Sequence, residues 1–96
     1  MNNPMKERRY GLIKYTAEVI EDSPEMMQKV FGKLVPLDVD YDFTNGVFSM
    51  KAASEYFDVV EVGKIIPTYN VKFQQVLRKI NYQKQIAVYI KFEKQS

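Results

Sequence analysis

Three aspartates at alternate positions, Asp38, Asp40 and Asp42, form the most suggestive set of metal-ligand side chains in this 96-residue chain. The spacing Asp-x-Asp-x-Asp opens an EF-hand calcium loop, which also requires glycine at its sixth position and glutamate at its twelfth. Phe43 and Ser49 occupy those two positions. Alternate residues of a strand lie about 7 Å apart, too far for one small cation to bind all three carboxylates. We therefore interpret the triplet as the solvated face of a strand and predict no metal site.

The residue types that most often perform catalysis are scarce. The chain contains no histidine, so the commonest general base and the commonest metal ligand are both missing. It contains no cysteine either, which excludes disulfides and thiolate metal sites. Its four glycines are not clustered, and neither glycine-rich phosphate-binding motif occurs. Paired carboxylates can act without histidine, as in glycosidases, but no spacing places two acids across a cleft. We expect a protein that is not an enzyme and that needs no cofactor.

The charged residues are sorted along the chain, although the net charge is only +2. Residues 18–61 carry ten acids and three lysines, whereas residues 64–96 carry seven bases and one acid. Such asymmetry indicates a surface that meets a partner, because the summed field of a surface steers association. The acidic docking face is predicted to consist of Asp38, Asp40 and Asp42.

The C-terminal third interleaves bases with aromatic rings. Basic side chains that follow phosphates, with rings on which bases stack, commonly hold single-stranded nucleic acid. The same residues also fit a protein-docking surface or a solvated basic face, since exposed lysines protect sheet edges from aggregation. The outward-facing candidates for nucleic-acid or partner binding are Arg78, Lys79, Tyr82, Lys84, Tyr89 and Lys91.

A single small domain must position these residues. Residues 1–8 show no helix or strand period and predict a flexible N-terminal arm, followed by one α+β domain over residues 9–96. Residues 10–20 alternate between apolar and polar side chains, which predicts a half-buried strand. The buried face of this strand is expected to carry Ile13, Tyr15, Ala17 and Val19.

The next segment carries the signals of a helix start. Ser23 is a favourable N-cap, Pro24 suits the first helical position, and Glu25 suits the positive end of the helix dipole. Apolar residues then recur at helical spacing and predict one buried stripe, formed by Met26, Met27, Val30, Phe31 and Leu34. Pro36 forbids continuation of this helix.

Asn45-Gly46 predicts a β-hairpin with a two-residue type I′ turn, because both central residues of that turn have positive φ. In this register every apolar residue opposes another apolar residue on one side of the ribbon. The expected pairs are Phe43 with Phe48, Tyr41 with Met50, and Val39 with Ala52. The three aspartates lie on the other side, facing solvent.

The remaining segments predict further strands, and one of them is ambiguous. Residues 56–62 are expected to form a short strand, and residues 86–92 another, with Ile86, Val88, Ile90 and Phe92 inward. Residues 69–82 fit either a strand with a bulge or a helix that ends in basic residues. The absence of an acid from the first turn of that helix favours the strand.

The predicted fold class is therefore α+β, a small single domain in which an antiparallel sheet of four to five strands carries one or two helices on one face. If residues 69–82 are extended, the order of elements is β-α-β-β-β-β-β. If they are helical, the order is the ferredoxin-like β-α-β-β-α-β.

These features predict a non-catalytic interaction or accessory protein, which docks a partner protein or self-associates through complementary acidic and basic surfaces. The alternative is a small nucleic-acid-binding accessory protein that uses the basic, aromatic C-terminal third. Small size, absence of cysteine and richness in tyrosine are typical of accessory proteins of phages and mobile elements. No apolar run approaches the roughly 20 residues of a membrane helix, and no signal peptide is apparent. We expect a cytoplasmic protein with neither a membrane partner nor a small-molecule substrate.

Overall fold

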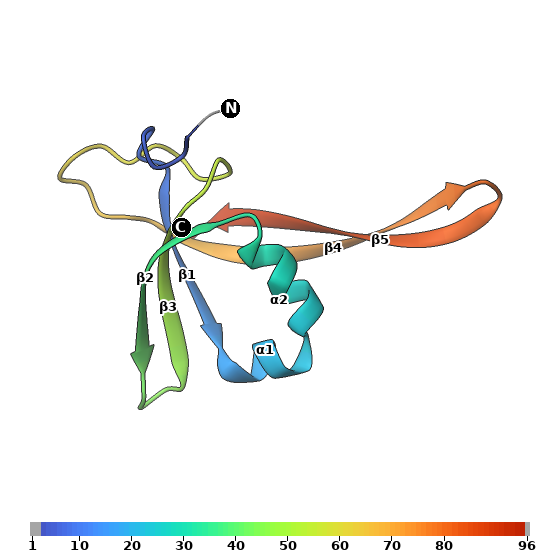
Figure 1. The fold of residues 1–96 in the computed structure, drawn as a ribbon, viewed down its shortest axis with the longest axis horizontal. Coiled ribbons are helices and arrows are strands. Elements are labelled where there is room, and N and C mark those ends of the chain that lie inside the picture. The colour runs from blue at the N-terminus through green and yellow to red at the C-terminus, as the bar shows by residue number, and fades with distance from the viewer. Residues whose placement is uncertain (1–2, 96) are drawn as a thin grey trace.

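A five-stranded mixed sheet and two short helices make up the fold in a computed structural model that describes residues 3–95 (Figure 1). The elements in chain order are β1 (Tyr10–Thr16), α1 (Ala17–Asp22), α2 (Pro24–Phe31), β2 (Val35–Asp42), β3 (Val47–Ala53), β4 (Thr68–Ile80) and β5 (Gln83–Lys94). The strands lie in the order β2-β3-β1-β4-β5. The α+β class and the small size agree with the sequence prediction.

The sheet is mixed rather than antiparallel, which corrects the predicted sheet. β1 pairs with β3 in the antiparallel sense but with β4 in the parallel sense, through two residue pairs that begin at Leu12 and Thr68. Parallel neighbours need a connection of a dozen or more residues, and residues 17–67 provide it between β1 and β4. We call the last part of this connection, residues 54–67 between β3 and β4, the crossover. Ala53, at the end of β3, pairs with Tyr10, at the start of β1, so the crossover stays at that end of the sheet and passes from β3 to β4. The observed order, β-α-α-β-β-β-β, matches neither predicted order.

The predicted strand over residues 10–20 ends early, at Thr16. The Thr16 hydroxyl accepts a hydrogen bond from the backbone N–H of Val19 at 3.3 Å and caps the first turn of α1. Such a cap satisfies a backbone donor that has no partner within the helix. Ala17 and Val19 are therefore helical, and the predicted buried face of the strand stops at Tyr15.

α2 begins at Pro24, as the sequence predicts, and covers one side of the sheet. Ser23 precedes it, but the Ser23 side chain makes no capping hydrogen bond. Val30 is fully buried and belongs to the core cluster together with Ile13 and Met50 from the sheet. Burial of each large aliphatic side chain contributes about 1.5–3 kcal/mol, so this cluster holds α2 in place. We call the side of the sheet under α2 the helix-side face and the other side the open face.

The hairpin between β2 and β3 forms, but its register differs from the predicted one by two residues, since Tyr41 pairs with Phe48. The Asp42 carboxylate accepts hydrogen bonds from the backbone N–H groups of Thr44 at 3.0 Å and Asn45 at 3.3 Å. These bonds stabilise a longer loop than the predicted two-residue turn. A shift by two residues leaves each side chain on its original face, so apolar residues still oppose apolar residues.

Residues 56–62 form a loop rather than the predicted short strand. Their backbone groups are bound by side chains from elsewhere in the chain. The Arg9 guanidinium donates to the carbonyl of Phe57 at 2.9 Å. The Tyr69 hydroxyl accepts from the backbone N–H of Asp58, also at 2.9 Å. The strand-like pairing in this segment is one isolated antiparallel bridge between Arg9 and Val59.

The described part of the predicted N-terminal arm, residues 3–8, forms consecutive turns beside this loop. Two hydrogen bonds join Arg8 to Val60. The Arg8 side chain donates to the Val60 carbonyl at 2.9 Å, and the Arg8 carbonyl accepts from the Val60 N–H at 2.8 Å. These bonds tie the N-terminal turns to the crossover between β3 and β4.

β4 and β5 leave the rest of the molecule as a two-stranded ribbon (Figure 1). We call this ribbon, residues 68–94, the long hairpin. Its base packs against the core through Tyr69 and Phe92, whereas its distal part extends beyond the other elements (Figure 1). The molecule accordingly measures 52 × 36 × 24 Å. The ambiguous segment 69–82 is thus a strand as far as Ile80, which excludes the ferredoxin-like alternative.

Candidate partner-binding surface

All six basic and aromatic candidates lie on the long hairpin, but they point in three directions. Directly paired residues share a side of a sheet. Tyr69 pairs with Ile13, which packs in the core with Val30 of α2, so Tyr69 lies on the helix-side face. The register then places each candidate. The open face carries Arg78, Tyr89 and Lys91, the helix-side face carries Lys79 and Lys84, and Tyr82 lies in the turn.

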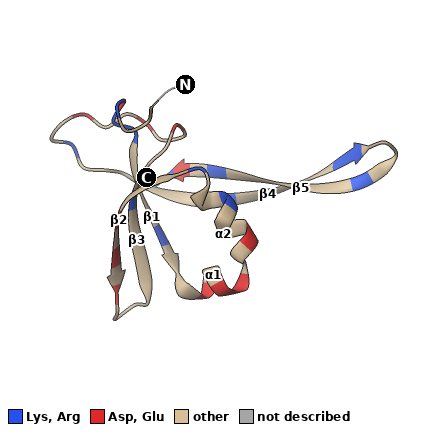
Figure 2. Ribbon diagram, in the orientation of Figure 1, with Lys and Arg blue, Asp and Glu red and all other residues tan. Residues whose placement is uncertain are grey.

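Positive charge accumulates on the long hairpin, because residues 71–92 contain no acid. Two lysine pairs face each other directly across its strands, Lys72 with Lys91 and Lys79 with Lys84. Like charges in directly opposed positions are destabilising. Figure 2 shows this basic ribbon projecting away from the acidic residues of β2 and of the helices. The charge distribution therefore weakens the free ribbon and favours contact with a negatively charged surface.

Arg78 is held against the open face of the ribbon. Its guanidinium carbon lies 5.0 Å from the centroid of the Tyr89 ring, which is within the range of a cation–π contact. Arg78 belongs to β4 and Tyr89 to β5. The contact therefore draws the positive charge across the ribbon toward β5, the outer strand.

The tip of the long hairpin is a two-residue turn in which Asn81 (φ 50°) and Tyr82 (φ 66°) both have positive φ. Asparagine is common in this conformation, but other L-residues with a Cβ lose about 1–2 kcal/mol there. The Tyr82 side chain is 97% exposed, so packing within the chain does not offset that cost. A type I′ hairpin turn requires positive φ at both of these positions, and the turn places the exposed Tyr82 ring at the end of the projecting ribbon.

Several apolar side chains of the long hairpin are exposed, and the sequence analysis did not identify them as surface residues. Leu77 and Ile86 pair with each other on the helix-side face and are 63% and 68% exposed. The alternation of residues 86–92 correctly places Ile86 on the side of the core, but the core ends before the ribbon does. A turn at Asn81 was the sequence signal that could have revealed this exposure. It divides residues 68–94 into two long strands that pair over more residues than any other two strands of the sheet.

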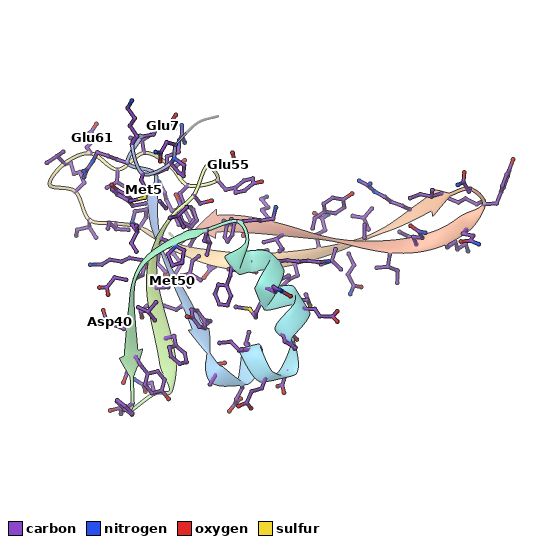
Figure 3. The ribbon with its side chains drawn as sticks, in the orientation of Figure 1. Met5, Glu7, Asp40, Met50, Glu55 and Glu61 are labelled. Atoms are coloured by element: carbon purple, nitrogen blue, oxygen red, sulfur yellow. The ribbon has the colours of Figure 1, made fainter. Side chains whose placement is uncertain are left out.

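The acidic candidates lie on β2, at the opposite edge of the sheet from β5. Asp38 and Asp40 belong to the open face, and Figure 3 shows Asp40 directed away from the helices. Asp42 is engaged in the loop, where the hydrogen bonds from Asn45 lower the pKa of its carboxyl group. The acidic and basic candidates of one chain are therefore not adjacent. The acidic candidates lie on or at the end of the outer strand β2, and the basic candidates lie on β4 and β5, toward the opposite edge of the sheet.

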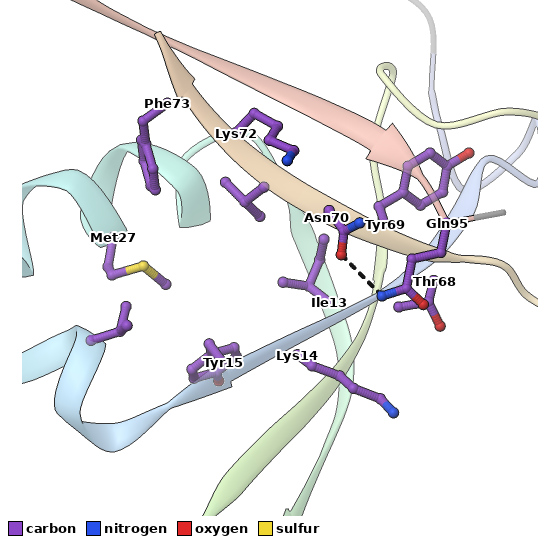
Figure 4. Close-up of a pocket in the computed structure, with 12 residues that line it drawn as sticks. Ile13, Lys14, Tyr15, Met27, Thr68, Tyr69, Asn70, Lys72, Phe73 and Gln95 are labelled. Carbon is purple, nitrogen blue, oxygen red and sulfur yellow. Dashed lines mark hydrogen bonds between the residues drawn. The ribbon is translucent and has the colours of Figure 1, made fainter. Parts of the chain in front are cut away.

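A groove of about 510 Å³ opens where β1 and β4 diverge (Figure 4). The two strands pair over two residues only. Side chains from β1 and β4 beyond that point, such as Tyr15 and Val71, line the open wedge together with Met27 of α2. Gln95 Nε2 donates to Asn70 Oδ1 at 3.0 Å within the lining (Figure 4). Burial raises the pKa of the Tyr15 hydroxyl above its ordinary value of 10.0. The lining can accept an apolar side chain.

Within residues 3–95, no group of three or more acidic side chains is arranged to hold a metal ion. In the same residues, no helix has the length and apolar character that crossing a membrane requires. No protein-family model, curated protein or solved structure matches the chain. The function is therefore inferred from the side chains of the long hairpin and of β2.

Proposed function

We propose that this chain is a non-catalytic interaction protein that docks on a partner protein, or on a second copy of itself, through the distal part of the long hairpin. The observation that carries the proposal is the uncovered apolar surface at Leu77 and Ile86. A two-stranded hairpin alone is marginally stable in water, and exposed contiguous apolar surface is typical of an interaction site. A partner that covers these side chains stabilises the ribbon.

Two other features of the long hairpin support a protein partner. Tyrosine is enriched at protein interfaces, because its ring provides contact area while its hydroxyl remains a hydrogen-bonding group, and Tyr82 offers such a ring at the tip. The opposed lysine pairs favour an acidic partner surface, since complementary charges steer association and fix its register. An apolar centre with a charged rim is the usual anatomy of an interface.

Photo-crosslinking from the ribbon tests this proposal. A photo-activatable phenylalanine analogue replaces Leu77 or Ile86, with Gln28 on the exposed side of α2 as the matched control position. In extracts of the cells that make the protein, we expect protein adducts from the two ribbon positions and none from the control. Excess wild-type chain should suppress the adducts, whereas excess chain with Leu77→Lys and Ile86→Lys should not. Absence of protein adducts from both ribbon positions contradicts the proposal.

Nucleic-acid binding is the second candidate function, and one specific observation favours it. The distal ribbon is a two-stranded β element with bases on both faces and no acid among residues 71–92. The major groove of DNA admits a ribbon of this kind, and neutralisation of phosphates supplies the affinity.

A salt-dependent anisotropy titration with single-stranded and duplex oligonucleotides tests the second candidate. Binding should be measurable near about 50 mM salt and fall steeply by about 200 mM. Changing Arg78, Lys79 and Lys84 to glutamate should abolish it, whereas Lys29→Glu on α2 should change it little. No binding at the lower salt concentration removes this candidate.

A further inference from the structure

β2 and β5 are the two outer strands of the sheet, and among residues 3–95 no strand pairs with the outer side of either. The unpaired N–H and C=O groups of such an edge can pair with a strand of another molecule. Pro36 and the irregularity between Pro36 and Asp38 interrupt the first part of β2, because proline has no N–H to donate. The usable edge of β2 is therefore residues 38–42.

The two free edges match in direction. β2 and β1 are each antiparallel to β3, and β4 is parallel to β1. β5 is antiparallel to β4, so β5 runs opposite to β2. A second copy placed beside the first in the same orientation presents its β5 to β2 as an antiparallel neighbour.

The edges also match in their apolar faces. Val39 and Tyr41 lie on the helix-side face of β2, and Ile86 and Val88 lie on the helix-side face of β5. Val39, Tyr41 and Ile86 are exposed in the single chain. Continuing the sheet from one copy into the next removes this apolar surface from water on a single shared face, which stabilises the junction.

The charges on the open face distinguish this pairing from the alternatives. β2 carries Asp38 and Asp40 on that face. The long hairpin carries the Arg78 guanidinium drawn toward β5 and Lys91, whose Nζ lies 3.6 Å from Oε1 of Glu93 on the same face. Pairing β5 with β5 brings bases together, and pairing β2 with β2 brings acids together. Like charges directly opposed are destabilising, so charge selects contact between unlike edges.

We infer that the partner of the long hairpin is a second copy of this chain, whose β2 receives β5 as an added antiparallel strand. The inference rests on the proposed function and identifies its partner. Because the contact joins two different surfaces, each copy retains one free edge of each kind. Such a heterologous contact forms a ring if the rotation closes and a helical chain if it does not.

Reciprocal charge exchange in the full chain tests the inference. One variant carries Asp38→Lys and Asp40→Lys, and the other carries Arg78→Glu and Lys91→Glu; Asp42 is left unchanged because it closes the loop. In sedimentation velocity over a wide concentration range, the wild-type chain should assemble. Each variant alone should associate at least about tenfold more weakly. An equimolar mixture of the two should regain assembly, because both kinds of edge again meet opposite charge.

The control matched to the Asp38→Lys, Asp40→Lys variant carries Glu21→Lys and Glu25→Lys on the helices, the same change in net charge away from both edges, and should assemble as the wild-type chain does. Circular dichroism checks that each variant folds. A wild-type chain that stays monomeric at every concentration, or a mixture that does not regain assembly, overturns the inference. If the Ile86 probe still captures a different protein in that case, the proposed function stands, whereas loss of all protein capture overturns both.

Mapping of the contact provides a second readout that needs no charge change. A photo-activatable analogue at Tyr41, in a mixture of isotope-labelled and unlabelled chains, should form adducts between chains with residues 83–90. Adducts between the β5 strands of two copies, formed from the same analogue at Ile86, overturn the inference, because they show that like edges pair.

Discussion

Gly11 lies directly against the ring of Phe57: a Cβ atom at position 11 would lie 2.7 Å from Cε2 of that ring. The Phe57 side chain is 1% exposed and stacks on Tyr69, with ring centroids 4.3 Å apart. The ring therefore has no space into which it can move. The crossover of residues 54–67 closes onto β1 because position 11 carries no side chain.

Changing Gly11 to alanine should lower the free energy of unfolding by about 1–3 kcal/mol, the usual cost of overpacking a core. Urea unfolding measures the change. Gly32→Ala is the matched control, because a Cβ there meets its nearest atom, the Gln28 carbonyl oxygen, at 3.4 Å and should be neutral or stabilise by up to about 1 kcal/mol. Equal stability of the two variants would contradict the close packing of Gly11 against the ring.

Ser54 connects the crossover to the end of α2. Its hydroxyl donates to the Lys33 carbonyl at 2.8 Å and accepts from the Tyr56 N–H at 3.2 Å, and the residue is 1% exposed. Ser54→Ala leaves these two backbone groups without that partner, so we expect a loss of about 1–3 kcal/mol in the free energy of unfolding. Ser23→Ala, whose hydroxyl makes no capping bond, should change it by less than about 0.5 kcal/mol. A neutral Ser54→Ala variant would show that the hydroxyl is dispensable.

The ion pair between Lys94 Nζ and Asp58 Oδ2, 2.7 Å long, joins the end of β5 to the crossover. The Lys94 hydrogen bond lowers the pKa of Asp58 below its ordinary value of 3.8, and the Asp58 bond raises the pKa of Lys94 above its ordinary value of 10.5. The stabilisation from Asp58 is present above pH 3.8 and is lost as the pH falls through the lowered pKa. The contribution of Lys94 is present below pH 10.5 and is lost as the pH rises through the raised pKa.

We therefore expect the carboxyl pKa of Asp58, measured by NMR titration, to rise toward its ordinary value in the variant Lys94→Met. The same variant should lose less stability than the wild-type chain as the pH falls below about 4. Asp42 is the internal control, because Asn45 lowers its pKa and Lys94→Met should leave it unchanged. Both carboxyl groups are exposed, so added salt should reduce the Asp58 effect. An Asp58 pKa that is the same in both proteins excludes the pair in solution.

Elements whose signals lie within one segment of the chain could be predicted from the sequence, and those that depend on distant residues could not. The start of α2 was predictable, because Pro24 and the apolar spacing after it act within one segment. The register of the β2–β3 hairpin was not, since a shift by two residues preserves every match of apolar faces. The hydrogen bonds of Asp42 decide between the two registers. The loop at residues 56–62 was also unpredictable, because its partners, Arg9 and Tyr69, are distant in sequence.

The candidate surface was predictable in its charge but not in its geometry. Acids and bases are sorted along the chain, and the structure likewise places Asp40 and Arg78 toward opposite edges of the sheet, in β2 and β4. The pairing of β4 with β5 determines which side of the ribbon each base occupies. Predicting that pairing required recognising the turn at Asn81. The apolar residue Ile86 alternates as a core strand does, and only the length of the ribbon leaves it exposed.

Tyr82 links the stability of the long hairpin to the proposed docking function. Replacing Tyr82 by glycine removes an L-residue from positive φ (66°), so we expect the turn to gain up to about 1 kcal/mol and the amides of β4 and β5 to exchange hydrogen several-fold more slowly. The same change removes the 97% exposed ring, so crosslinking from Ile86 should weaken. Asn81→Gly, which keeps the ring, should change neither the exchange nor the crosslink appreciably, because asparagine already tolerates positive φ. If Tyr82→Gly slows exchange and crosslinks as strongly as the wild-type chain, the ring does not contact the partner.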